Sequence, residues 1–318
     1  MSDSPPTTIR LGTRGSLLAR SQSQVVADEV ERRAGGAVHV ELVIVKTSGD
    51  RVTDQPLRDI GGKGLWTKEL EQALLAREID FAVHSFKDVP VTQPLVDQAD
   101  LCIAAVPERE DPRDVFCSLS GKRIEDLPQG AKVGTGSMRR RCQLLALRGD
   151  LKVELLRGNI DTRLRKLRDG QYEAIILAAA GLRRTGLFNE SEMTMLEPDQ
   201  MLPAPGQGAL AIQCRRNDAR TRDILALLDD PMSERCVTAE RVIVQALGGD
   251  CQSPIGALAR IEGDEMTLRA VVGGRGGELP VVRAQASGPA DGSGDGAVEA
   301  VLKSLSQQNV QALLANGR

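Results

Sequence analysis

The fold of the central part of the chain is decided by residues 132–184, which read KVGTGSMRRRCQLLALRGDLKVELLRGNIDTRLRKLRDGQYEAIILAAAGLRR. Strands are predicted at 132–134, 152–156 and 174–177. Helical spacing follows from Ser137 and again over residues 160–168. This β-α-β-α-β order predicts a parallel sheet with right-handed crossovers.

The same patterning continues on both sides of this stretch. Helices are predicted at 16–33 and 65–77, and strands at 38–45, 81–83 and 101–106. Val38, Val40, Leu42 and Ile44 are expected on one face of their strand. The polar, Gly-rich segment 47–64 is predicted to be a long loop. Toward the C-terminus we expect a strand and a helix within 209–228, a helix at 234–246, Gly-separated strands and a final helix at 297–314.

Two breaks divide the 318 residues into three predicted domains. The first break is the charged segment 109–113, and the second is the Pro- and Gly-rich segment 202–208. Domain 1 is expected to comprise residues 1–107 with 206–228, which could return to it. Domain 2 would comprise 108–205 and domain 3 would comprise 229–318. Domains 1 and 2 are expected to be α/β, and domain 3 to be α+β.

Composition excludes several classes of protein. Aromatic residues make up 2% of the chain and the net charge is -3, which argues against nucleic-acid binding. Six widely spaced cysteines without a C-x-x-C pair, and two histidines, predict no metal site and reduced thiols. Residues 1–8 lack an apolar segment and no run is long enough to cross a membrane, so a cytoplasmic protein is expected.

Basic residues are concentrated where the central strands end. Residues 132–184 contain 13 Lys and Arg against 5 Asp and Glu. Thr135, Ser137, Arg157 and Arg184 follow predicted strands, where helix N-termini present free N–H groups. A ligand with several carboxylates or phosphates would fit there. The alternative is a solvated helix face, which suits Arg165, Lys166 and Arg168 well; no Walker loop is present.

Two further places carry candidate chemistry. Asp88 follows a predicted strand beside Ser85 and Lys87, where a carboxylate can stabilise positive charge or move a proton. The alternative for Asp88 is a surface carboxylate paired with Lys87. Cys251 lies in the small-residue turn GGDCQSPIG (248–256) and is either an ordinary loop thiol or a functional one.

A set of short stretches then resembles a known family. The stretches are residues 12–16 (GTRGS), 61–65 (GGKGL), 84–90 (HSFKDVP), 108–114 (EREDPRD), 134–140 (GTGSMRR), 156–159 (LRGN), 202–208 (LPAPGQG) and 250–256 (DCQSPIG). In this order they resemble porphobilinogen deaminase, also called hydroxymethylbilane synthase. The resemblance extends over residues 9–260.

The resemblance implies a fold and an activity. Two periplasmic-binding-protein-like (type II) α/β domains would face a cleft, and a small C-terminal α+β domain would carry a dipyrromethane on Cys251 through a thioether. Four porphobilinogen molecules would be joined head to tail to this primer with loss of ammonia. Hydrolysis would release hydroxymethylbilane for haem or chlorophyll synthesis. A monomer that passes its product to uroporphyrinogen-III synthase is implied.

The resemblance also implies a role for individual residues. Asp88 would be catalytic. Carboxylates of the cofactor would be held by Ser85, Lys87, Thr135, Ser137, Arg139, Arg140, Arg157 and Arg184. Substrate would be bound by Arg14, Ser16, Lys63, Arg157, Arg163 and Gln207. Four positions depart from the family pattern, namely Asp59, Trp66, Phe86 and Asp250.

Two other hypotheses stand beside the enzyme. The first is a non-catalytic anion-binding protein built on the same two-lobed fold, which a signal peptide would favour. The second is an RNA-binding protein that uses the basic strand ends, which the overall negative charge disfavours.

Overall fold

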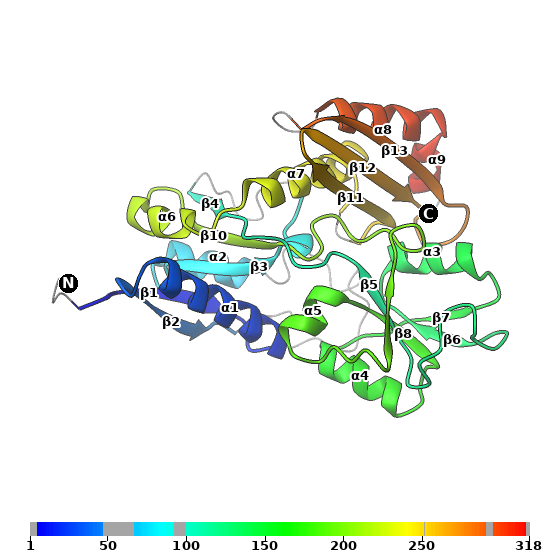
Figure 1. Ribbon diagram of the computed structural model, residues 1–318, viewed down its shortest axis with the longest axis horizontal. Helices are drawn as coiled ribbons and strands as arrows, with labels where there is room; N and C mark the ends of the chain where they lie inside the picture. The colour runs from blue at the N-terminus through cyan, green and yellow to red at the C-terminus, as the bar shows by residue number, and fades with distance from the viewer. Residues whose placement is uncertain (1–4, 47–66, 92–99, 251, 291–294, 316–318) are drawn as a thin grey trace. The chain divides into compact units, whose positions relative to one another are not determined.

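The computed structural model describes residues 5–46, 67–91, 100–250, 252–290 and 295–315. The chain divides into two compact units (Figure 1). The first unit comprises residues 1–109 and 209–234, and the second comprises 110–208 and 235–318. Within the described ranges, the first unit contains one five-stranded sheet, and the second contains a five-stranded and a three-stranded sheet.

The sheet of the first unit has the order β2-β1-β3-β10-β4. Its strands are β1 (Thr7–Thr13), β2 (Val38–Ile44), β3 (Phe81–Ser85), β4 (Leu101–Ala105) and β10 (Leu210–Arg215). Strand β1 is parallel to β2 and β3, whereas β10 is antiparallel to β3 and β4. The helices are α1 (Leu17–Arg33), α2 (Lys68–Leu75) and α6 (Ala219–Ala226), with a 3-10 turn, η2, at Phe86–Asp88.

Helices cover both faces of this sheet, because successive strand residues point to opposite sides. On one face, Val26 and Val30 of α1 and Leu225 of α6 pack with Leu11. On the other face, Leu70 and Leu74 of α2 pack with Ile79 and Ala82. This arrangement leaves the ends of the strands, rather than the faces, accessible for binding.

The larger sheet of the second unit repeats this topology in the order β7-β6-β8-β5-β9. Its strands are β5 (Asp114–Cys117), β6 (Lys132–Gly134), β7 (Lys152–Glu154), β8 (Ala174–Ala178) and β9 (Met193–Leu196). Strand β6 is parallel to β7 and β8, and β5 is antiparallel to β8 and β9. The helices are α3 (Met138–Leu147), α4 (Ile160–Arg168) and α5 (Ala179–Arg184).

The third sheet is an antiparallel meander of β11 (Ile255–Glu262), β12 (Glu265–Val272) and β13 (Val282–Pro289). Helices α7 (Pro231–Ala246), α8 (Asp295–Gln307) and α9 (Val310–Ala315) accompany it, and α8 packs on β12 and β13 (Figure 1). Buried Glu240 of α7 accepts hydrogen bonds from the N–H groups of Ala259 (2.9 Å) and Gly206 (2.7 Å). These bonds join the small sheet to the segment that precedes β10.

The expected mixed α/β class, with two sheet-and-helix domains and a smaller sheet with helices, is confirmed. The predictions for α4 and β6 agree with the structure at both ends. The 65–77 helix is described from Lys68 to Leu75, and β3 continues two residues beyond the predicted 81–83. The predicted loop 47–64 lies outside the described residues.

Three expectations were wrong in part. The second sheet is mixed and not all-parallel, because β5 is antiparallel to β8 and β9. Neither β5 nor β9 was predicted, since each has four residues, too few for a clear alternation. Strand β7 ends at Glu154 and not at the predicted residue 156, since the chain turns there toward Gly158, whose φ is 116°. The final helix is broken into α8 and α9, with Asn309 in the left-handed region at φ 54°. On the face that Val38 and Val40 share, these two residues are buried, and Ile44 at the end of the strand is 58% exposed.

Candidate active site

Asp88 lies at the C-terminal end of β3, where the strand passes into η2. Its side chain is exposed, and among the described residues no group forms a hydrogen bond or ion pair with it. The alternative of a surface pair with Lys87 is therefore wrong for this structure, although Lys87 has interactions of its own. A carboxylate that pairs with no described residue and lies at a strand end can bind a ligand.

Other predicted residues lie at the same edge of the first sheet. Strands β1 and β3 are parallel neighbours, so their C-terminal ends meet there. Ser16 caps α1, its hydroxyl accepting a hydrogen bond from the Ala19 N–H (3.3 Å). The Gln22 side-chain amide of α1 donates to the Ser85 hydroxyl at the end of β3 (3.0 Å). The half-buried Arg14 precedes the same helix.

A buried polar chain lies behind this edge. His84 Nε2 lies 2.9 Å from Oε1 of Gln213, and Gln213 Nε2 donates to Oε1 of Glu71 (3.2 Å). Burial, assisted by the positive charge of Arg14, lowers the pKa of His84 to about 4. Burial also raises the pKa of Glu71, whose Oε2 atom has no hydrogen-bond partner among the described residues. His84 is therefore neutral at pH 7 and fixes the end of β3 to β10 and α2.

At the C-terminal edge of the β6 and β7 strands in the second unit, the turn between β6 and α3 contacts the turn between β7 and α4. The Thr135 N–H donates to the Glu154 carbonyl (2.9 Å), and the Ser137 N–H donates to the Thr135 hydroxyl (3.2 Å). A Cβ atom on Gly136 would lie 3.0 Å from the Leu156 carbonyl oxygen and 3.9 Å from Cδ of Arg157. The structure thus brings Thr135, Ser137 and Arg157 together at the N-terminus of α3.

Two more predicted arginines are fixed by backbone carbonyls. Arg163 Nε donates to the Gly158 carbonyl (2.7 Å), which places Arg163 beside the turn that carries Arg157. Arg184 Nη2 donates to the Gly208 carbonyl (2.7 Å). Burial lowers the pKa of Arg157, and lowers that of Arg184 to about 10. Arg184 therefore remains charged at neutral pH.

Arg139 and Arg140 surround a carboxylate of the protein itself. Arg139 Nη1 donates to Asp114 Oδ2 (2.8 Å), and Arg140 Nη2 donates to Asp114 Oδ1 (2.7 Å). Gln207 Nε2 also donates to Asp114 Oδ1 (2.8 Å) and to the Pro112 carbonyl (2.7 Å). All four side chains are buried. Burial alone would raise the pKa of Asp114, but the two arginines hold it well below its usual value.

The sequence did not predict the roles of Asp114, Gln22, Gln213 and Glu71. Asp114 lies in the 108–114 motif (EREDPRD), but the sequence of this motif does not indicate which of its charged side chains is buried. The hydroxyl of Ser137 links the two groups of residues in the second unit, because it also accepts the Arg140 N–H (3.4 Å). Of the predicted binding residues of the second unit, Ser137, Arg157, Arg163 and Arg184 are partly exposed, whereas Thr135, Arg139, Arg140 and Gln207 are buried.

Lys63 and Cys251, with the departures Asp59 and Trp66, lie outside the described residues. The positions next to Cys251 form a tight turn. Asp250 Oδ1 accepts hydrogen bonds from the Gln252 N–H (2.9 Å) and the Ser253 hydroxyl (3.0 Å), and the Asp250 N–H donates to that hydroxyl (2.9 Å). The unusual Asp250 is thus explained by the turn it closes.

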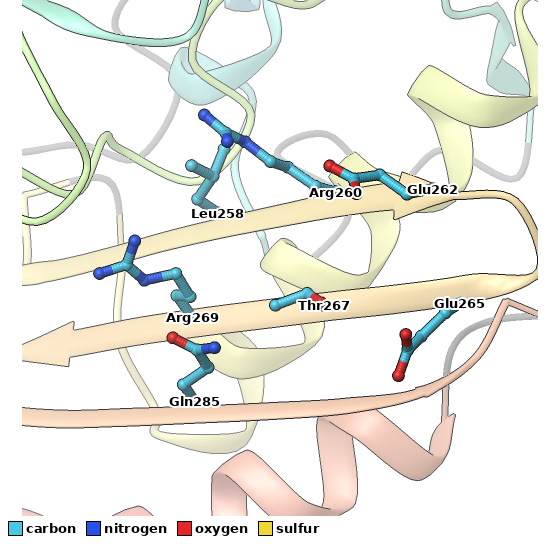
Figure 2. A pocket seen from close by; sticks show the side chains of 7 residues that line it. All are labelled: Leu258, Arg260, Glu262, Glu265, Thr267, Arg269 and Gln285. Carbon is cyan, nitrogen blue, oxygen red and sulfur yellow. The ribbon is translucent and has the colours of Figure 1, made fainter.

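A shallow hollow lies on the open face of the small sheet, lined by Leu258, Arg260, Glu262, Glu265, Thr267, Arg269 and Gln285 (Figure 2). Its lining mixes both signs of charge, and Arg269 is already paired with Asp199. None of the predicted site residues lines it. We assign no function to this hollow.

No group of three His, Cys, Asp or Glu residues in the described ranges is arranged to hold a metal ion. Among the described helices, none has both the length and the apolar character needed to cross a membrane.

Comparison with known proteins identifies the family. Residues 9–223 match the family described as porphobilinogen deaminase, dipyromethane cofactor binding domain, and residues 234–303 match porphobilinogen deaminase, C-terminal domain. The chain belongs to the porphobilinogen deaminase family. Porphobilinogen deaminases are hydroxymethylbilane synthases, transferases of tetrapyrrole biosynthesis whose substrate is porphobilinogen, and the larger matched domain binds the dipyrromethane cofactor.

Relatives match over most of their length. The porphobilinogen deaminase of Roseiflexus sp. (strain RS-1) is 46% identical over 309 residues, which cover 97% of this chain and 99% of the relative. That of Syntrophobacter fumaroxidans is 49% identical over 282 residues, 89% of each chain. Among solved structures, the methionine-binding protein MetQ is 14% identical with a TM-score of 0.44, covering 76% of this chain and 94% of that one.

The residues present fit the dipyrromethane of this family. Its acetate and propionate groups need hydrogen-bond donors, and the edge of the second sheet supplies the N-terminus of α3, the Thr135 and Ser137 hydroxyls, and Arg157. Gly136 leaves the backbone open there, because its position is exposed. The edge is therefore suited to bind carboxylates.

Proposed function

We propose that this chain joins four porphobilinogen molecules head to tail on a dipyrromethane attached through a thioether to Cys251, and releases hydroxymethylbilane by hydrolysis. The observation that carries the proposal is the exposed carboxylate of Asp88, which has no partner among the described residues. When bound, the dipyrromethane supplies the pyrrole carbon to which the first substrate is joined.

Asp88 is the proposed catalytic residue. Loss of ammonia from porphobilinogen leaves a cation, and positive charge also develops on the pyrrole nitrogen as a new bond forms. A carboxylate that has no competing ion pair can stabilise both charges and accept the pyrrole N–H. The short η2 turn holds Asp88 beyond the end of β3. The Val89 N–H closes this turn by donating to the Phe86 carbonyl (3.1 Å).

The carboxylates of substrate and cofactor are proposed to bind at the two strand edges. Arg157 and Arg163, beside Thr135 and Ser137, provide guanidinium and hydroxyl donors from adjacent turns. At the first sheet, Arg14 and the capped N-terminus of α1 provide a second set. The same role is proposed for Ser85, Lys87, Arg139, Arg140, Arg184, Gln207 and, outside the described residues, Lys63.

The buried state of Arg139 and Arg140 makes their proposed role indirect. Their charges are balanced by Asp114, and Arg139 also donates to the Leu202 carbonyl. We propose that they act through the Ser137 turn, because the Ser137 hydroxyl caps α3 by accepting the backbone N–H of Arg140. We further propose a cytoplasmic monomer whose product passes to uroporphyrinogen-III synthase.

The proposal is tested by Asp88→Asn, which keeps the shape of the side chain and removes its charge. Turnover of porphobilinogen should fall about 100-fold or more, while the melting temperature stays unchanged, since Asp88 supports no other described group. Asp223→Asn, at an exposed position on α6, is the control and should remain fully active. Wild-type turnover in Asp88→Asn would remove Asp88 from the mechanism.

Intact mass tests the attachment separately. Purified protein should be heavier than its sequence by two pyrrole units, and the added mass should map to the peptide that contains Cys251. Cys251→Ser should lack both the added mass and the activity. A sequence-only mass in active wild-type protein would contradict the proposed thioether.

A further inference from the structure

Two thiols face each other in the sheet of the first unit. Cys102 on β4 and Cys214 on β10 are direct partners in the antiparallel register. Both belong to the core between α1, α6 and the sheet, where Cys214 is fully buried and Cys102 is partly buried against it. Both cysteines are in the thiol state.

The backbone geometry at this pair suits a disulfide. Directly opposed residues of antiparallel strands have Cα atoms about 4.5–5.5 Å apart and point to the same face. Disulfides span Cα separations of about 4.4–6.8 Å. Cys214 Sγ lies 3.4 Å from the Arg215 carbonyl oxygen, and the residue directly opposite it on the neighbouring strand is Cys102. Rotation of the two side chains is enough to join the sulfurs.

We propose that Cys102 and Cys214 are a site of oxidative modification, at which a hydroperoxide converts the two thiols into a reversible disulfide. The proposal is independent of the roles of Asp88 and Cys251. It joins the edge strand β4 covalently to β10, the strand that pairs with β3 on its other side.

The chemistry starts at Cys102, which is the more exposed of the two. Its thiolate attacks one oxygen of the hydroperoxide and breaks the O–O bond, which leaves a sulfenic acid and one water or alcohol. Cys214 sulfur then attacks the Cys102 sulfur, the S–O bond breaks, and the leaving hydroxide takes the Cys214 proton to form water. Two electrons pass from the thiols to the peroxide, and the protein loses two hydrogens.

The environment of Cys214 supports this order of events. Burial, together with the neighbouring Cys102, raises the pKa of Cys214 to about 12, so it stays protonated and unreactive toward peroxide by itself. It lies where it can resolve a sulfenic acid on Cys102. Elsewhere in the described residues, Cys117, Cys142 and Cys236 are buried and belong to other parts of the fold.

The experiment exposes purified protein to hydrogen peroxide, alkylates the remaining thiols and maps the peptides by mass. We expect a peptide pair linked through Cys102 and Cys214, 2 Da lighter than the two thiol peptides, that dithiothreitol separates. Cys102→Ala and Cys214→Ala should each lose the linked pair. Cys236→Ala, which removes a buried cysteine from α7, is the matched control and should keep it.

Thermal unfolding gives a second measurement that does not depend on peptide recovery. A disulfide that closes a long loop restricts the unfolded chain, so oxidised protein should melt at a higher temperature than the same sample after reduction. Cys102→Ala should show no such difference. The proposal is overturned if Cys102 stops at sulfinic acid, if a disulfide forms between other cysteines, or if both thiols stay reduced after the peroxide is consumed.

Discussion

The carboxylate of Asp114 and the guanidinium of Arg139 form an ion pair, 2.8 Å from Oδ2 to Nη1, in which both side chains are buried. Arg140, the next residue of α3, forms a second ion pair with the other carboxylate oxygen of Asp114. Asp114 begins β5 and the arginines lie in the first turn of α3, so this ion pair fixes the helix that follows Thr135 and Ser137. The buried charges therefore position the partly exposed Ser137 at the start of α3.

Asp114→Asn should destabilise the protein by about 3–5 kcal/mol, because it leaves two buried guanidinium groups without a compensating charge. The measurement is the free energy of unfolding in urea. Asp150→Asn is the control, since its ion pair with Arg148 is at the surface, and its effect should be small. Equal stability of the two variants would show that the Asp114 pair does not hold α3.

Arg157→Leu should raise the KM for porphobilinogen about 10- to 100-fold, the effect of losing one charge-assisted hydrogen bond to a carboxylate. Arg157 is half-buried beside Gly136, where a carboxylate can reach both its side chain and the α3 N-terminus. Arg168→Leu, at the exposed end of α4, removes the same charge away from this turn. A similar KM in both variants would indicate only a diffuse electrostatic effect.

The local features of this structure could be predicted from the sequence, because they depend on residues close together in the chain. Apolar spacing located α1 and α3, and the structure shows Ser16 and Ser137, at the predicted helix starts, as their N-caps. The burial of Arg139 and Arg140 could not be predicted from the sequence, because their partner Asp114 is 25 and 26 residues away in the chain. Gln207, which also donates to Asp114, is 93 residues away from it. A basic residue in a first helical turn looks the same in sequence whether it faces a ligand or a buried aspartate.

His84 should make folding sensitive to mild acid. Burial lowers its pKa to about 4 in the folded protein, against about 6.5 in an unfolded chain. Between these values the unfolded state binds the extra proton, so the folded state loses stability as the pH falls through this interval. From pH 7 to pH 5 the loss from this group should be about 2 kcal/mol.

His84→Gln removes this titration and can keep a hydrogen bond to Gln213, so its stability should change less between pH 7 and pH 5. Urea unfolding at both pH values measures the difference. His39→Gln removes the exposed histidine and should retain the wild-type pH dependence. If His84→Gln and wild type lose the same free energy between the two pH values, another group is responsible for acid sensitivity.

Gly136→Ala should disturb the binding edge of the second sheet. The new Cβ would lie 3.0 Å from the Leu156 carbonyl oxygen, a backbone atom that cannot rotate away, so the Thr135–Ser137 turn must move. Because displacements of about 1 Å can cost 100-fold in rate, we expect kcat/KM to fall at least 10-fold. Gly149→Ala, whose Cβ would meet its nearest atom at an ordinary 3.5 Å, should leave kcat/KM unchanged. Wild-type kinetics for Gly136→Ala would mean that the turn tolerates the shift and that carboxylate binding does not depend on its geometry.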